Sequence, residues 1–182
     1  MSELNDGPIA PRLENGIRDD GRVTRHIYRI EIRASAERIW TAVTDPEWTV
    51  RYGYRGRVQI EPRIGGTYAV HKPAGLRVMT ERGPAPAPDM LIQGVVTKFD
   101  PPHRLGVRMR FLVDPFTAAE PETHVLYEID ELDGERCSLT IVHDLTGAPR
   151  LATIVSGDFR DLGAGGGHPL LLAELKALLE TD

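Results

Sequence analysis

Hydrophobic and polar side chains alternate along much of the chain, and this period of two is typical of β-strands with one face in water. The strand-like segments are 24–32, 58–60, 68–70, 91–99, 107–113, 125–129 and 137–143. Turn sequences join three pairs of them, namely Ile64-Gly65-Gly66, Asp100-Pro101-Pro102 and Asp133-Gly134. Because parallel strands need long crossover connections, usually helices, these segments predict an antiparallel sheet.

Two short helices are expected directly after the first strand. Ser35 is suited to cap a helix that places Ile39, Trp40 and Val43 on one face. The dipeptide Asp45-Pro46 ends this helix and starts a second one, which we expect to end near Gly53.

The C-terminal part of the chain predicts two further helical segments. Residues 149–162 have hydrophobic residues at helical spacing, but Gly157 costs about 1 kcal/mol relative to alanine, so we expect a partial helix. Glycines in 163–167 end it, and Pro169 begins a terminal helix. Its apolar stripe consists of leucines, which are Leu171 or Leu172, Leu175, Leu178 and Leu179.

Two segments lack both periods. Residues 1–22 are polar, so we interpret them as a flexible tail and residues 23–182 as a single domain. Residues 72–89 contain Gly83-Pro84-Ala85-Pro86-Ala87-Pro88, which is too rich in proline for a central strand, and we expect a long loop. Whether the proline-rich part, 83–88, acts as a lid is left open.

Composition narrows the classes of function. The net charge of −5 disfavours binding to nucleic acid or to an anionic membrane, and no apolar run suggests a signal or a membrane anchor. The single cysteine, Cys137, fits a reducing compartment, and we expect a cytoplasmic protein. The six histidines show no metal-ligand spacing, so neither a metal site nor a cofactor is predicted.

Several short motifs resemble the homologues of the activator of heat-shock protein 90 ATPase, a branch of the START-like or birch-allergen-like superfamily. The motifs are Ile39-Trp40 with Val43-Thr44-Asp45-Pro46-Glu47, Pro62-Arg63 with Gly65-Gly66, Gly94 with Asp100-Pro101-Pro102, Arg104-Leu105, and Leu175-Lys176 with Leu178-Leu179-Glu180-Thr181. One departure is His168-Pro169-Leu170, which stands where the family often has tryptophan.

The resemblance implies an α+β helix-grip fold, in which a curved antiparallel sheet of about seven strands wraps around a long C-terminal helix. It also implies a cavity between sheet and helix. Members of the family bind hydrophobic small molecules, catalyse cyclisations or dehydrations, or act on chaperones. Aromatic residues make up 6% of the chain, so we expect that large side chains do not fill this cavity.

Candidate ligand-binding residues are those that the periods place on the inner side of the sheet or of the helices, or beside the second short helix. They are Trp40, Trp48, Tyr52, Tyr68, Met109, Phe111, Tyr127, His143, Leu172 and Leu175. Tyr54 is a further candidate for the entrance. Ordinary core packing is the alternative for each of them.

His143 and Tyr127 are the candidate catalytic residues, because they face the same way on neighbouring predicted strands. The alternative for His143 is a buried core histidine bonded to its surroundings. The alternative for Tyr127 is a core aromatic whose hydroxyl is paired.

Three functions remain open. The first is binding of an apolar small molecule, polyketide-like or lipid-like, in natural-product biosynthesis or in self-resistance by sequestration. The second is a cyclase or dehydratase that uses His143 and Tyr127. The third is a co-chaperone-like activator, which is disfavoured because only about 22 polar residues precede the first strand. The oligomeric state, monomer or dimer, is left open.

Overall fold

The main sheet in the computed structural model has eight strands, and every neighbouring pair is antiparallel, as the hydrophobic pattern predicts. The structure describes residues 12–17, 23–80, 82–133, 135–158 and 165–181. In spatial order the strands are β1 (Arg12–Ile17), β2 (Val23–Ile32), β10 (Arg136–Asp144), β9 (Thr123–Asp133), β8 (Arg104–Phe111), β7 (Met90–Asp100), β4 (Thr67–His71) and β3 (Arg57–Ile60).

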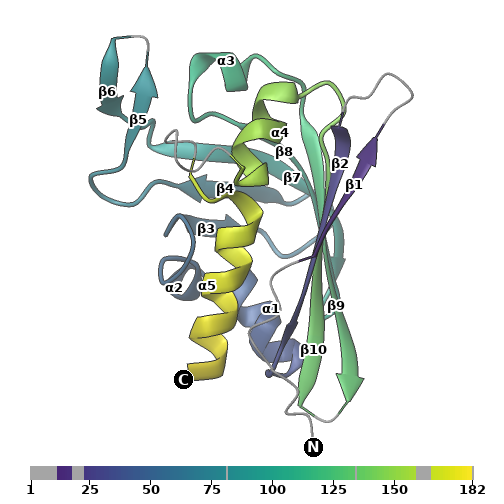
Figure 1. Cartoon of the computed structure of the whole chain (residues 1–182). Helices are drawn as coiled ribbons and strands as arrows, with labels where there is room; N and C mark the ends of the chain where they lie inside the picture. Colours follow the sequence, from purple (N-terminus) through teal and green to yellow (C-terminus); the bar gives the residue numbers. More distant parts are fainter. Residues whose placement is uncertain (1–11, 18–22, 81, 134, 159–164, 182) are drawn as a thin grey trace, which may run out of the picture.

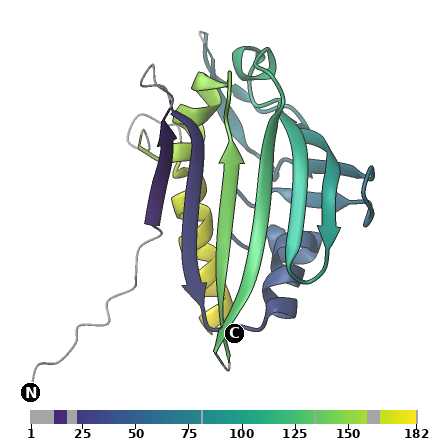
Figure 2. The ribbon, with the colours of Figure 1, turned by 90° about the vertical axis from the view of Figure 1, so that its right-hand side faces the viewer.

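Helices cover the concave face of this sheet. Those in the described residues are α1 (Ala36–Thr44), α2 (Pro46–Thr49), α3 (Pro115–Ala118), α4 (Pro149–Ser156) and α5 (Gly167–Thr181). Figures 1 and 2 show α5 along the inner side of the curved sheet, with α1 beside it on the same side. This arrangement confirms the α+β helix-grip fold. No helix in the described part of the chain is long and apolar enough to cross a bilayer.

The main hydrophobic core lies between the sheet and α5. Tyr28 on β2 and Ile141 on β10 are fully buried, and α5 contributes Leu172, Leu175 and Leu179. Each fully buried leucine contributes about 1.5–3 kcal/mol relative to an exposed one, so this stripe is the main attachment of α5 to the sheet.

The caps of α1 and α2 are those that the sequence predicts. The Ser35 hydroxyl accepts a hydrogen bond from the Arg38 N–H at 3.3 Å, and the Asp45 carboxylate accepts one from the Glu47 N–H at 2.7 Å. Pro46 occupies the first turn of α2, where its missing N–H needs no partner. Helix α2 ends at Thr49, earlier than expected.

The prediction of a tail over residues 1–22 is wrong for Arg12–Ile17. These six residues form β1, which pairs antiparallel with β2 at the edge of the sheet and makes the strand count eight instead of about seven. Its sequence, RLENGI, lacks regular alternation and so gives no strand signal. An edge strand can still form, because backbone hydrogen bonds to its neighbour hold it even with few apolar side chains. Residues 1–11 and 18–22 lie outside the described residues.

The prediction of a long loop over residues 72–89 is also wrong in part. Strands β5 (Arg77–Thr80) and β6 (Gly83–Pro86) form a separate two-stranded sheet. Pro84 and Pro86 lack a ladder N–H, but in a two-stranded ribbon one side of each strand needs no partner, so proline is tolerated. The exclusion of this segment from a central strand is confirmed.

The joint between α4 and α5 depends on glycine. Helix α5 begins at Gly167, two residues before Pro169, and Gly167 has a φ of +59°. A Cβ at this position would collide with the carbonyl oxygen of Val155 in α4, so the two helix ends come together only at a glycine. Helix α4 ends at Ser156, and part of the predicted extension to 162 lies outside the described residues.

Candidate functional site

A hollow of about 320 Å³ lies between α1 and the strands β3 and β7. Trp40 and Phe99 form its aromatic wall, with their ring centroids 5.4 Å apart in an edge-to-face arrangement. The remaining lining residues are Thr41, Thr44, Asp45, Pro46, Ile60 and Pro62. Apart from the Asp45 carboxylate, the polar side-chain groups of this lining are the Thr41 and Thr44 hydroxyls and the indole N–H of Trp40.

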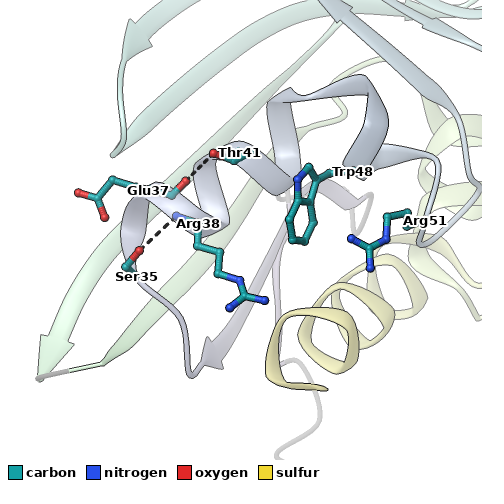
Figure 3. A pocket seen from close by; sticks show the side chains of 6 residues that line it. All are labelled: Ser35, Glu37, Arg38, Thr41, Trp48 and Arg51. Carbon is teal, nitrogen blue, oxygen red and sulfur yellow. Dashed lines mark hydrogen bonds between the residues drawn. The ribbon is translucent and has the colours of Figure 1, made fainter. Parts of the chain in front are cut away.

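A second hollow, of about 580 Å³, lies on the outer side of α1 and α2 and is more open to solvent. Figure 3 shows its six lining residues, Ser35, Glu37, Arg38, Thr41, Trp48 and Arg51. The Trp48 ring lies between two guanidinium groups, with Arg51 at 4.7 Å and Arg38 at 5.9 Å from its centroid. Such cation–π contacts hold Trp48 in place at the surface.

Strand pairing relates two residues that line the first hollow to two tyrosines on the inner face of the sheet. Ile60, which lines the hollow, pairs directly with Tyr68 on β4. Phe99 pairs with Leu105 on β8, and Leu105 pairs with Tyr127 on β9. Directly opposite residues share one face of a sheet and lie about 5 Å apart, so Tyr68 lies one strand from Ile60 and Tyr127 lies two strands from Phe99.

The hydroxyls of the inner tyrosines differ in their partners. Tyr52 donates a hydrogen bond to the carbonyl oxygen of Ala42 at 2.9 Å. Burial raises the pKa of all three phenols, and that of Tyr127 reaches about 12. The Tyr127 and Tyr52 phenols raise the pKa of Tyr68 further. All three are neutral phenols at pH 7.

Met109, Leu172 and Leu175 are closely packed in the core, at 0–2% exposed, and do not line an open space. Phe111 is partly buried and stacks on His143, with ring centroids 6.1 Å apart. In the described residues, the two hollows above lie around α1, away from the interface between sheet and α5 where the sequence analysis expects the cavity.

His143 belongs to a buried cluster of histidines. Its Nδ1 lies 3.0 Å from Nε2 of His168, and its Nε2 lies 2.9 Å from the hydroxyl of Thr123. In the same cluster, Tyr28 bonds to Nδ1 of His26 at 3.3 Å and packs its ring against His168. His168 therefore lies in the core where the family resemblance leads one to expect tryptophan.

The cluster is neutral at pH 7. Burial lowers the pKa of His143 well below its usual value, with the other histidines as a second cause. Burial also lowers the pKa of His168 to about 3 and the pKa of His26 by a smaller extent, which the Asp158 carboxylate opposes. Both ring nitrogens of His143 are engaged by groups other than Tyr127, so the geometry is that of a core histidine.

Sequence reasoning missed Phe99 and His168. The register of β7 shifts between Val96 and Lys98, and this irregularity turns Phe99 to the inner face, where a strict period of two would place Lys98. His168 meets His26 and His143 only through tertiary packing, for which the sequence contains no local signal. Among the described residues, no cluster of His, Cys, Asp or Glu is placed to hold a metal ion.

Residues 33–180 match the model of the family described as activator of Hsp90 ATPase homolog 1-like protein. No curated protein matches the chain significantly. Solved structures similar to it include CalU16 from Micromonospora echinospora, with 18% identity, a TM-score of 0.58, and coverage of 94% of this chain and 84% of CalU16.

Two further solved structures share the fold. An Hsp90 activator from Plasmodium falciparum has 13% identity and a TM-score of 0.52, with coverage of 78% of this chain and 97% of that one. DynU16, described as a putative protein in the dynemicin biosynthetic locus, has 19% identity and a TM-score of 0.57. The match covers 87% of this chain and 48% of DynU16, so the chain spans about half the length of that protein.

Proposed function

The chain belongs to the activator of Hsp90 ATPase homolog 1-like family, and from this premise we propose that it binds an apolar small molecule, polyketide-like or lipid-like, in the hollow beside α1. The observation that carries the proposal is the aromatic wall of Trp40 and Phe99 around about 320 Å³. Pockets for small ligands are mostly apolar, with a few polar groups, and occupy about 300–1,000 Å³.

The lining fits such a ligand energetically. Each 100 Å² of apolar ligand surface removed from water contributes about 2.5 kcal/mol. Ile60, Pro46 and Pro62 complete the wall with apolar surface, and aromatic rings of the ligand can pack against Trp40 and Phe99 at little entropic cost.

We place this binding in natural-product biosynthesis or self-resistance by sequestration. The fold shared with DynU16, a putative protein of a biosynthetic locus, supports this setting. Sequestration needs no catalytic group, which suits a site where both nitrogens of His143 are engaged elsewhere. The buried free thiol of Cys137 supports a reducing location such as the cytoplasm.

Binding is measured with 1-aminoanthracene, a neutral probe whose fluorescence rises in apolar surroundings. We expect saturable binding, with competition by emodin as a polyketide-like ligand and by 1-dodecanol as a lipid-like one. Trp40→Ala removes half of the aromatic wall and weakens probe binding about tenfold or more, as loss of a central aromatic anchor does.

Phe116→Ala is the matched control, because Phe116 is an exposed aromatic residue on α3, outside the lining of the hollow. Its probe affinity should equal that of the wild type. Absence of saturable binding would contradict the proposal. So would a loss of affinity in Trp48→Ala with none in Trp40→Ala, since the ligand would then occupy the outer hollow.

A further inference from the structure

Two phenol hydroxyls in the interior have no hydrogen-bond partner among the described residues. Tyr68 and Tyr127 make no side-chain hydrogen bond with any described residue, whereas every fully buried side-chain nitrogen or oxygen in that part of the chain has a partner. The two hydroxyls are therefore not fully enclosed by protein atoms. Each must touch space that a water molecule can enter.

This space lies inside the protein. Tyr127 is partly accessible although its strand neighbours Leu105 and Ile141 are at most 1% exposed. Its pKa is nevertheless raised to about 12 by burial. The accessible part of Tyr127 therefore lies on the inner face of the sheet, between buried neighbours. Tyr68 is 6% exposed and shows the same combination.

In the order of the sheet, the two phenols lie close to the strands that line the hollow beside α1. Tyr68 lies opposite Ile60, and Tyr127 lies two strands from Phe99. On its other side Tyr68 pairs with Gly94, which has no side chain to cover the phenol. A ligand held against the aromatic wall reaches the two hydroxyls if it extends inward from Ile60 by one strand and from Phe99 by two.

The hydrogen-bonding groups of the two phenols and the charges that line the hollow determine which class of ligand fits. A phenol that keeps its proton offers a donor, and a buried donor left without an acceptor costs about 1–3 kcal/mol. Tyr52 donates its hydroxyl proton to the Ala42 carbonyl oxygen, and its own oxygen could still accept a hydrogen bond, but none joins it to Tyr68 or Tyr127 in the described residues. The residues that line the hollow include no cationic side chain, and they include the Asp45 carboxylate. A carboxylate ligand would therefore enter without a counter-charge.

We propose that the site recognises a neutral aromatic ketone or quinone, whose carbonyl oxygens accept hydrogen bonds from Tyr68 and Tyr127. This inference rests on the proposed function and narrows it, because it favours polyketide-like ligands over fatty acids. A hydrocarbon of the same shape would displace water from the two hydroxyls and leave them unpaired, and sites built in this way discriminate against such analogues.

The test compares three probes with one ring skeleton, which are 9-fluorenone, fluorene and fluorene-9-carboxylate. Each competes with 1-aminoanthracene on the wild-type protein and on Tyr68→Phe and Tyr127→Phe. We expect fluorenone to bind the wild type more tightly than fluorene, and the carboxylate to bind most weakly. Each variant should lose about fivefold in affinity for fluorenone, the size of one neutral hydrogen bond. Its affinity for fluorene should stay the same or rise, because the variant has one hydroxyl fewer to leave unpaired.

Tyr28→Phe is the matched control, because Tyr28 is a buried phenol on the same side of the sheet whose hydroxyl is already bonded to His26. Its affinity for both neutral probes should stay at the wild-type value. Fluorene binding at least as tight as that of the wild type also shows that each variant is folded.

Two results would overturn the inference while leaving the proposed function intact. One is equal binding of fluorenone and fluorene to the wild type. The other is a loss of affinity in the tyrosine variants that is the same for both probes. Failure of 1-aminoanthracene and of all three fluorene probes to bind would overturn the proposed function and this inference together.

Discussion

At the scale of single residues, the histidine cluster is the part of the core most sensitive to pH. His26, His143 and His168 are 3%, 0% and 8% exposed and meet one another, a tyrosine and a threonine. Protonating His143 or His168 would place a charge inside the core, next to the N-terminus of α5, whose dipole opposes a cation. The folded state therefore holds these rings neutral.

The sign of the pH dependence follows from these lowered pKa values. At pH values below the usual pKa of 6.5, these histidines bind protons in the unfolded chain but not in the folded chain. The free energy of unfolding therefore has its full value above pH 6.5. It falls as the pH decreases towards the folded pKa of about 3 for His168. Each such histidine contributes a slope of up to about 1.4 kcal/mol per pH unit.

The slope of the unfolding free energy against pH measures the number of protons that the chain takes up on unfolding. We predict that His168→Gln lowers this number by about one between pH 7 and pH 5, as measured by urea denaturation at several pH values. The variant can be less stable at every pH, but only the slope tests the titration. His71→Gln, outside the cluster, is the control for the loss of a histidine elsewhere in the chain. An unchanged slope in His168→Gln would show that His168 does not titrate on unfolding.

At the scale of elements, local signals in the sequence predicted what local physics decides. The Ser35 and Asp45-Pro46 caps and the alternation in β8, β9 and β10 defined those elements, because caps and the pleat act over a few residues. Strand β1 and the β5–β6 hairpin were missed because pairing with a neighbouring strand, and not their own side-chain pattern, makes them strands.

The start of α5 allows a prediction at this scale. Gly167→Ala combines a positive φ with a collision against the backbone of Val155, and we expect it to lower the free energy of unfolding by about 3 kcal/mol or more. Gly75→Ala is the control, since Gly75 has a φ of +76° and open space where the alanine Cβ would lie. It should lose about 1 kcal/mol, the cost of the backbone conformation alone. Equal losses in denaturation experiments would refute the steric argument.

At the scale of the whole molecule, the motifs and strand order predicted the fold, while the position of the hollow could not be predicted. The low aromatic content suggested an unfilled space under α5, but Met109, Leu172 and Leu175 fill it, because aliphatic side chains pack as densely as rings. Accessible space remains beside α1 and at the hydroxyls of Tyr68 and Tyr127. The size of the space beside α1 depends on how far α1 lies from β3 and β7. No periodicity encodes that distance.

The proline-rich segment is the last element whose role depends on its place in the molecule. Figure 1 shows the β5–β6 hairpin at the upper edge of the molecule and α1 near the lower one. The hairpin is closed at its base by the bond from the Ala87 N–H to the Leu76 carbonyl oxygen at 3.0 Å, and half of the β6 side chains are exposed. This placement argues against a lid over the hollow beside α1.

We therefore predict that replacing 77–86 by Gly-Gly changes the free energy of unfolding by less than about 1 kcal/mol and leaves 1-aminoanthracene binding and release unchanged. Stopped-flow fluorescence measures the release rate, and faster release from the shortened protein would establish the segment as a lid after all.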